Sequence, residues 1–312
     1  MQIHIGIDNL KINGCVATIG MFDGVHKGHQ QLISELVQIA HQQKLPSVVL
    51  TLWPHPKTIL SNGRAKVNLL STLDEKAEII ATLGVDHLVV MEFNKRVSQL
   101  TPTRFIRDIL INKLHVRHLH MGFNHHFGAG NTSPDEQLQL CQAEGLACTI
   151  GKPYIDTQNG QCSSSAIREK ISNGAVDVAA EMLGRRYTIS GTIVHGDGIG
   201  HKIGFPTANL KVDQDCKLIP SDGVYATMVD FDGQMRPAVV DIGIRPTIEG
   251  KEHRIEAHII NFSAKIYGRK MTICFFSRIR DEKRFSMLEE LEKQIVNDID
   301  LATKILCQYS QN

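Results

Sequence analysis

The sequence has no apolar run that approaches the roughly 20 residues of a membrane helix. It also begins without a basic stretch followed by an apolar one, so we expect no secretory signal. The sequence also has no excess of one charge, because it contains 34 Lys and Arg residues and 33 Asp and Glu residues, which gives a formal net charge of +1. We therefore expect neither nucleic acid nor a membrane as a partner, and any phosphate site must be local.

The seven cysteines are scattered and contain no Cys-x-x-Cys pair. This pattern argues against a disulfide framework and against a structural zinc site, and it favours a reduced, cytoplasmic protein. No obligate protein partner is indicated. With 312 residues, 42% of them hydrophobic, the chain can form one large or two medium-sized domains.

Short apolar runs alternate with helical patterns over the first half of the chain. The strand candidates are residues 15–19, 48–51, 87–91, 118–121 and 147–150. Two capping boxes, Thr72 with Glu75 and Ser133 with Glu136, predict where helices begin between them. This alternation predicts an α/β domain with a doubly wound, Rossmann-like parallel sheet.

From residue 187 the pattern changes to short strands separated by turns. The candidates are residues 187–195, 224–230, 236–242, 255–261 and 271–276. They predict a small antiparallel barrel or sandwich, of which we expect the barrel. A capping box of Ser286 with Glu289 predicts a C-terminal helix. We expect the two domains to be residues 1–182 and 183–312.

A ten-residue string joins the first strand candidate to a helical pattern over residues 30–42; it reads Gly20-Met21-Phe22-Asp23-Gly24-Val25-His26-Lys27-Gly28-His29. Such a junction offers backbone N–H groups and the positive end of a helix dipole to an anion. His26 and His29 would share a face, where they could stabilise a transferring phosphoryl group. They could equally be polar residues at a helix start. Zinc is not favoured, because no further ligands cluster nearby.

Loops at the carboxyl ends of parallel strands are the expected place for ligands. Residues 52–56 contain Pro54 and His55, and could also be only a rigid turn. Residues 122–128 contain Asn124. Residues 163–168 begin a helix with three serines, including Ser164, and with Arg168. Hydroxyls and a guanidinium suit a pyrophosphate, although serines are also ordinary N-caps.

Residues 195–210 read His-Gly-Asp-Gly-Ile-Gly-His-Lys-Ile-Gly-Phe-Pro-Thr-Ala-Asn-Leu. They do not form a Rossmann fingerprint, because no apolar-periodic helix follows, and they are not a Walker loop. The string is either a glycine loop over phosphates or a turn of the barrel. On an extended segment, Thr207 and Asn209 would point the same way and offer oxygen ligands to Mg²⁺.

Together these strings resemble the prokaryotic bifunctional riboflavin kinases/FMN adenylyltransferases, or FAD synthetases. The first string matches GxFDGVHxGH, residues 51–56 match TFxPHP with Leu52 in place of Phe, and residues 163–168 match SS(T/S)xIR. Residues 122–128 match G-x-(D/N)-F-x-F-G, with His125 in place of an aromatic residue. The glycine loop matches G-x-x-x-G-x-x-x-G-F-P-T-A-N, with His201 where Arg is usual. Agreement continues through residues 219–226, 241–247, 255–258 and 280–285.

The resemblance implies two reactions. The barrel would transfer the γ-phosphoryl group of ATP to the 5′-hydroxyl of riboflavin and give FMN. The N-terminal domain would transfer AMP from a second ATP to FMN and give FAD and pyrophosphate. Mg²⁺ is the implied cofactor, and riboflavin, FMN and ATP are the implied small-molecule partners.

The resemblance also assigns residues to roles. The implied catalytic residues are His26, His29, Arg168 and Glu256, where Glu256 is the base for the flavin hydroxyl. The implied ATP and phosphate ligands are Gly20, Phe22, Asp23, Gly28, Asn124, Ser164, Gly198, Gly204 and Pro206. The implied flavin contacts are Pro54, His55, Arg280 and Phe285, and the implied metal ligands are Thr207 and Asn209.

Two alternatives stay open. Only one half could be active, because the departures at His125 and His201 lie in the two nucleotide loops. The chain could also be a flavin-binding sensor that has kept the fold and lost catalysis.

Overall fold

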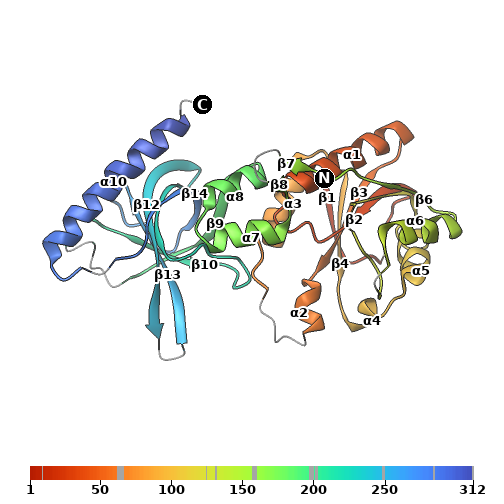
Figure 1. Ribbon diagram of the computed structural model, residues 1–312, viewed down its shortest axis with the longest axis horizontal. Helices are drawn as coiled ribbons and strands as arrows, with labels where there is room; N and C mark the ends of the chain where they lie inside the picture. The colour runs from red at the N-terminus through yellow and green to blue at the C-terminus, as the bar shows by residue number, and fades with distance from the viewer. Residues whose placement is uncertain are drawn as a thin grey trace. The chain divides into compact units, whose positions relative to one another are not determined.

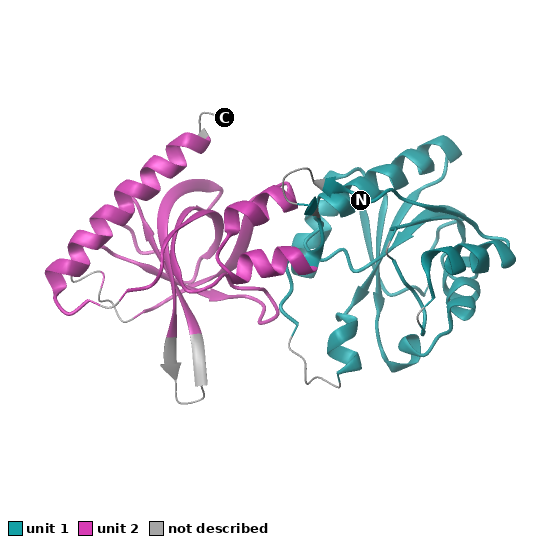
Figure 2. Ribbon diagram, in the orientation of Figure 1, with its two compact units in different colours: residues 1–164 teal, residues 165–312 magenta. Residues whose placement is uncertain are grey.

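The computed structural model describes the chain except for residues 9, 62–66, 124, 131, 157–159, 197–199, 201–202, 248–249, 284 and 311–312. Three residues discussed above, Asn124, Gly198 and His201, therefore lie outside the described residues. The chain divides into two compact units, residues 1–164 and 165–312 (Figures 1 and 2). In the described part, no helix is long and apolar enough to cross a membrane.

Unit 1 is built on a six-stranded sheet whose pairings are all parallel, in the order β1-β4-β3-β2-β5-β6 (Figure 1). The strands are β1 (Gln2–Ile5), β2 (Cys15–Ile19), β3 (Ser47–Trp53), β4 (His87–Glu92), β5 (Val116–Met121) and β6 (Ala147–Ile150). The predicted parallel sheet is confirmed, and β1 is an edge strand that the sequence pattern did not predict. The chain runs outward from β2 to β4 and then returns to β5 beside β2. The switch point between β2 and β5 is where such sheets bind ligands.

Helices cover both faces of this sheet, so it is doubly wound. Alternate residues of β2 point to opposite faces: Val16 packs with Ile33 and Leu36, whereas Ala17 packs with Ile106. The helices α1 (Lys27–Gln43) and α3 (Leu73–Thr82) pack in the core on the Val16 face of the sheet. The helices η1 (Phe105–Ile111) and α6 (Pro134–Ala143) pack in the core on the Ala17 face. Both predicted capping boxes are present, at α3 and α6. Shorter elements are α2 (Pro56–Leu60), α4 (Lys95–Ser98), α5 (Pro102–Arg104), β7 (Ile155–Asp156) and β8 (Gly160–Gln161).

Unit 2 is a closed antiparallel barrel, which confirms the predicted fold (Figure 1). The order of its strands is β10-β13-β12-β11-β14-β9. Its strands are β9 (Tyr187–Val194), β10 (Ala208–Val212), β11 (Gly223–Phe231), β12 (Gln234–Thr247), β13 (Gly250–Ile259) and β14 (Lys270–Arg280). Two helices precede the barrel, α7 (Ser164–Ser172) and α8 (Val176–Leu183), and α10 (Leu288–Ser310) follows it. The predicted pairing of Ser286 with Glu289 is not what the structure shows, because α10 begins at Leu288 and the Ser286 hydroxyl lies 3.4 Å from the Glu290 carboxylate.

The barrel has a filled interior and an outer face covered by α10. Tyr225 and Val240 are fully buried inside, whereas their neighbours Val224 and Val239 face outward and pack with Ala302 of α10. The helix α10 contacts β11, β12 and β14. Every second residue of these strands therefore points outward, to a surface enclosed between the barrel and α10. The second candidate site lies at this surface.

Candidate active sites

The first candidate site begins at the loop that leaves β2. Two of its residues other than glycine have positive φ, Phe22 at 47° and Val25 at 38°. Such conformations persist only where the surroundings enforce them, and they gather at functional sites. Gly20 is closely packed, because a Cβ there would lie 3.1 Å from the Phe22 ring. The loop therefore has one fixed shape.

Asp23 holds this loop to a second one. Its carboxylate accepts hydrogen bonds from the backbone N–H groups of Leu70 at 3.0 Å and Ser71 at 3.1 Å, and the residue is 2% exposed. The N–H of Gly24 donates to the Ser71 hydroxyl at 3.0 Å. A carboxylate that is paired with backbone donors and shielded from solvent holds the loop in position. The predicted role of Asp23 in binding phosphate stays a prediction.

Lys76 supports the same loop from α3, and the motif analysis did not single it out. Its ammonium donates to the carbonyl of Met21 at 2.6 Å and to the Thr51 hydroxyl at 3.2 Å, at the ends of β2 and β3. Burial lowers the pKa of Lys76 to about 8, against the charge of Asp23, which raises it. The signal in the sequence was a lysine one residue before Ala77, on the apolar face of a predicted helix.

The two predicted histidines are brought together at the start of α1. His26 is the N-cap, and its Nδ1 accepts a hydrogen bond from the N–H of His29 at 3.4 Å. Their rings are stacked with centroids 3.7 Å apart. A side chain at Gly28 would crowd the pair, since its Cβ would lie 3.2 Å from the His26 ring. The expectation that the two imidazoles share a face is confirmed.

His29 has a nitrogen available for a ligand. Its Nδ1 is buried and has no hydrogen-bond partner among the described residues. Burial lowers the pKa of His29 well below its ordinary value, and the nearby charges of His26, Lys76 and His125 lower it further. The imidazole is therefore neutral at pH 7, with one nitrogen to donate and one to accept.

His125, which stands where the family has an aromatic residue, joins this cluster. Its Nε2 is likewise buried without a hydrogen-bond partner in the described part of the chain. Burial, with a smaller contribution from His126, lowers the pKa of His125 to about 4. The ring of His125 lies 6.1 Å from that of Phe127, and the two rings are tilted by 40°. The substitution has exchanged an aromatic ring for a polar one beside His29.

We expect His125→Phe to flatten the acid sensitivity of unit 1. The folded pKa of His125 lies below the unfolded value of 6.5, so its stabilising contribution is complete above pH 6.5 and is lost as pH falls toward 4. This amounts to about 3 kcal/mol between pH 7 and pH 4. The chain has one tryptophan, Trp53 in β3, so its fluorescence in urea titrations at several pH values reports unit 1.

The matched control is His126→Phe, because His126 is exposed and its Nδ1 lies 2.9 Å from the carbonyl of Thr132. That variant is expected to keep most of the wild-type pH dependence, because burial, the larger cause of the lowered pKa of His125, is unchanged. If His125→Phe loses as much stability as the wild type when the pH is lowered, then protonation of the buried His125 does not destabilise the fold.

The other residues predicted for the adenylyl transfer site are Ser164, Arg168, Pro54 and His55. The Ser164 hydroxyl donates to the carbonyl of Asp23 at 2.9 Å, so the serine motif is tied to the first loop. Arg168 is half-buried in the second turn of α7 and belongs to unit 2. Pro54 follows a cis peptide bond, and the Nδ1 of His55 caps α2 by accepting from the N–H of Lys57 at 3.2 Å. The catalytic role of Arg168 and the flavin contacts of Pro54 and His55 stay predictions.

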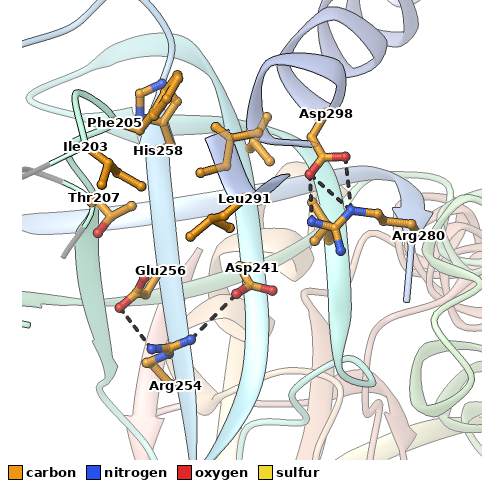
Figure 3. A pocket seen from close by; sticks show the side chains of 14 residues that line it. Ile203, Phe205, Thr207, Asp241, Arg254, Glu256, His258, Arg280, Leu291 and Asp298 are labelled. Atoms are coloured by element: carbon orange, nitrogen blue, oxygen red, sulfur yellow. Dashed lines mark hydrogen bonds and ion pairs between the residues drawn. The ribbon is translucent and has the colours of Figure 1, made fainter. Parts of the chain in front are cut away.

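The second candidate site is a pocket of about 260 Å³ in unit 2, between the barrel and α10 (Figure 3). Its polar lining includes Thr207, Asp241, Arg254, Glu256 and Arg280. Its apolar lining includes Leu291 and Ile295 of α10. A pocket with an apolar wall and a few converging polar groups is typical of a small-molecule site.

Strand register arranges the polar residues as a row. Asn209 of β10 is paired with Glu256 of β13, which is paired with Asp241 of β12. Asp241 is in turn paired with Val224 of β11, and Val224 with Arg280 of β14. Paired residues of adjacent strands point to the same face, at intervals of about 4.8 Å. The site therefore runs from Asn209 and Glu256 toward Arg280 and α10.

Charges at the two ends of this row are held differently. At one end, Arg254 lies 3.7 Å from Asp241 and 3.6 Å from Glu256, so one guanidinium is shared between two carboxylates (Figure 3). At the other end, Arg280 forms two parallel hydrogen bonds to Asp298 of α10, at 3.0 and 2.8 Å. Motif matching found Arg280 but not its partner Asp298, because a pairing between separate segments leaves no local pattern.

Thr207 borders a second pocket of unit 2 as well. That pocket has a volume of about 370 Å³ and is lined by Pro206, Ala208, Ala257, Ile259 and residues 262–267. The Nδ1 of His258 lies 2.9 Å from the carbonyl of Pro206, which fixes the segment that separates the two pockets. Two substrates placed in these pockets would meet at Thr207.

The other predicted residues near this segment have structural constraints. Gly204 has a φ of +83°, which favours glycine. A Cβ at Gly196 would collide with the side-chain amide of Asn209, so that amide packs directly on the glycine loop. Phe285 is half-buried, with its ring 6.0 Å from the Arg280 guanidinium. Among the described residues, no group of three or more His, Cys, Asp or Glu side chains could hold a metal ion.

Comparison with known proteins matches the two parts of the chain to two different families. The FAD synthetase family matches residues 8–166 and the riboflavin kinase family matches residues 183–306. The bifunctional riboflavin kinase/FMN adenylyltransferase of Pseudomonas fluorescens is 34% identical over 306 residues, which cover 97% of each chain. The enzyme of the same name from Escherichia coli K12 is 36% identical over 303 residues, 96% of each chain.

A solved structure shares the fold over nearly the full length. It is described as a macrolide-efflux protein from Streptococcus pneumoniae, and it matches with a TM-score of 0.88 and 28% identity over 97% of this chain and 99% of its own. The order of the motifs, the two folds and the two family matches agree with one another. This chain belongs to the family of bifunctional riboflavin kinases/FMN adenylyltransferases.

Proposed function

We propose that the barrel of unit 2 makes FMN from riboflavin and ATP, and that the parallel sheet of unit 1 makes FAD from FMN and a second ATP. The observation that carries the first assignment is the pair of pockets that meet at Thr207, with Glu256 beside it. The second assignment is supported by His29, whose unpaired nitrogen lies at the start of a helix at the switch point of the sheet.

In the kinase site, the flavin occupies the pocket against α10 and the nucleotide occupies the pocket at residues 262–267. The isoalloxazine ring packs on Leu291 and Ile295, and Arg280 binds it from the end of β14. Glu256 takes the proton of the 5′-hydroxyl as its oxygen attacks the γ-phosphorus, and ADP leaves. This is an in-line displacement, in which positioning supplies most of the catalysis.

In the adenylyl site, an oxygen of the FMN phosphate attacks the α-phosphorus of ATP, and pyrophosphate leaves. His29 is neutral and can donate a hydrogen bond to the oxygens that gain charge, while its partner His26 fixes the ring by stacking. Ser164 binds the pyrophosphate, and the catalytic role of Arg168 stays a prediction. Asp23 and Lys76 keep the loop in shape, because Asp23 bonds it to residues 70 and 71 and Lys76 bonds it to α3.

Mg²⁺ is the metal that we assign to the kinase site, and the residues present fit it. The Thr207 hydroxyl lines both pockets, and Asn209 stands beside Glu256 in the sheet. These neutral oxygens suit an ion that is held mainly by nucleotide phosphates and water. Bound there, Mg²⁺ would neutralise the triphosphate.

We expect chelation to abolish both activities. Each site must neutralise a triphosphate, and neither motif supplies the lysine of a Walker loop. Formation of FMN and FAD is followed by chromatography in excess EDTA and again after Mg²⁺ is restored in excess. Full turnover in EDTA would contradict the assignment of Mg²⁺ to either step.

Incubation of the protein with riboflavin and Mg-ATP, followed by chromatography of the products, tests the proposed function directly. FMN and FAD together support it. If the protein forms only FMN, or forms FAD only when FMN is supplied, then only one half of the chain is active. If it binds flavin but forms no product, the chain is a flavin-binding sensor. Family membership favours the bifunctional enzyme. We place the reactions in the cytoplasm, with no nucleic-acid, membrane or protein partner.

The boundary of the kinase domain can be tested with two fragments. We proposed residues 183–312 for this activity, whereas the compact unit begins at residue 165. The difference includes α8, which contacts β9 and β14 and buries Ala179, Met182 and Leu183. We therefore expect residues 165–312 to fold and phosphorylate riboflavin, and residues 183–312 to unfold at lower temperature in circular dichroism. Equal melting of the two fragments would show that α8 adds nothing to the barrel.

A further inference from the structure

Asp241 is the residue of the kinase pocket to which the proposed mechanism gives no role. It lies on β12 at the centre of the row that strand register forms, one strand from Glu256 and two strands from Arg280. In Figure 3 its carboxylate projects into the pocket, beside Glu256 and Arg254. Any ligand that reaches from α10 to Glu256 must pass it.

The two oxygens of Asp241 have different surroundings. Oδ2 lies 3.7 Å from the guanidinium of Arg254. Oδ1 is buried and has no hydrogen-bond partner among the described residues. A buried acceptor without a donor is unfavourable, so such groups in native proteins usually have a reason. In a ligand pocket, the reason is a donor on the ligand.

The charges around Asp241 decide what kind of donor it can take. Burial raises the pKa of Asp241 to about 6, and the carboxylates of Glu282 and Glu256 act in the same direction. Arg254 and Arg280 oppose them. At pH 7 Asp241 is therefore mostly ionised and can only accept, so its ligand must supply an O–H or N–H group.

The proposed position of riboflavin brings such a group to this place. Its 5′-hydroxyl lies at Glu256 and its ring lies against Leu291 and Ile295, so the ribityl chain between them crosses β12. Adjacent strands are separated by about 4.8 Å, which is within the length of a five-carbon chain. The chain carries secondary hydroxyls on the three carbons between the ring end and the 5′-carbon.

We propose that Asp241 is a specificity residue of the kinase site, and that its Oδ1 accepts a hydrogen bond from a secondary hydroxyl of the ribityl chain. The inference rests on the proposed function of unit 2 and adds to it. Asp241 distinguishes a polyhydroxylated chain from an apolar chain of the same length, because the apolar chain leaves Oδ1 buried and unpaired. The same hydrogen bond sets the direction in which the 5′-hydroxyl approaches Glu256.

The test pairs two substrates with two enzymes. The substrates are riboflavin and the flavin that carries a 5-hydroxypentyl chain, which keeps the terminal hydroxyl and lacks the secondary ones. The enzymes are the full-length wild type and Asp241→Ala. We expect Asp241→Ala to lower kcat/KM for riboflavin by about 10- to 100-fold, which corresponds to the loss of one hydrogen bond to a charged group. For the hydroxypentyl flavin, kcat/KM is expected to stay within about twofold of wild type.

Asp230→Ala is the matched control, because the Oδ1 of Asp230 is also buried and unpaired in the described structure but Asp230 does not line the pocket. It should leave both substrates unaffected. Asp241→Asn, which keeps the shape of the side chain, should fall between wild type and Asp241→Ala for riboflavin alone.

Three results would overturn the inference. Equal losses for both substrates would mean that Asp241 acts only through Arg254 and Glu256. No loss for either would mean that Asp241 does not touch the flavin. If the wild type forms no FMN at all, the proposed function fails and the inference falls with it, and this outcome is distinct from the other two.

Discussion

His29→Ala is expected to lower FAD formation from supplied FMN by about 10² to 10³, the typical result of losing one hydrogen-bond donor to a developing negative charge. The unpaired Nδ1 of His29, its neutral imidazole and its stack on His26 all indicate a ring prepared for such a donation. Phosphorylation of riboflavin by the same preparation should not change. The two products are measured by chromatography in separate assays, one with riboflavin and one with FMN as the flavin substrate.

His41→Ala is the matched control for this prediction, since it makes the same substitution at an exposed position of the same helix. It should leave both reactions at wild-type rates. Unchanged FAD formation in His29→Ala would remove His29 from the chemistry and leave the stacked pair as a structural N-cap. A parallel loss of FMN formation would contradict the separation of the two sites.

Glu256→Gln is expected to lower riboflavin phosphorylation by about 10² to 10⁴, because it removes the general base and keeps the shape of the side chain. Adenylylation of supplied FMN should be intact. The structure adds a second reason to use glutamine: Glu256 shares Arg254 with Asp241, and a smaller residue would release the guanidinium at the same time. Initial rates with saturating Mg-ATP give the comparison.

Glu289→Gln serves as the control for this variant, because Glu289 is an exposed residue of α10 that does not line the pocket. The opposite pattern, with FAD formation lost and FMN formation kept, would reverse the assignment of reactions to units. Equal loss of both reactions, with an unchanged circular dichroism spectrum, would mean that the two sites are coupled.

The sequence by itself determined the fold classes, because both leave periodic local patterns. Alternating strands and capped helices indicated the parallel sheet, and short strands between turns indicated the barrel. The capping boxes at Thr72 and Ser133 were predicted correctly, since a cap depends on residues three apart. Elements with weak local patterns were missed, namely the four-residue β1 and the five-residue β10, whose partner strands include β4 and β13, far along the chain.

The sequence also determined the pairing of His26 with His29, which a helix start brings together without help from the rest of the fold. The same holds for Gly20 and Gly28 beside them, where a Cβ would lie within 3.2 Å of a neighbouring ring. Local motifs thus indicated the residues nearest the expected chemistry. They did not reveal what holds those residues in place.

Only the tertiary structure decided how the sites are assembled. Asp23 turned out to pair with backbone N–H groups 47 and 48 residues along the chain, and Lys76 with the carbonyl of Met21, 55 residues away. The row from Glu256 through Asp241 to Arg280 exists because four strands pair in one register, and its pocket exists because α10 covers that face. The physical reason is the same in each case. A hydrogen bond or pocket between distant segments depends on strand register and helix packing, and neither leaves a pattern in the residues around it.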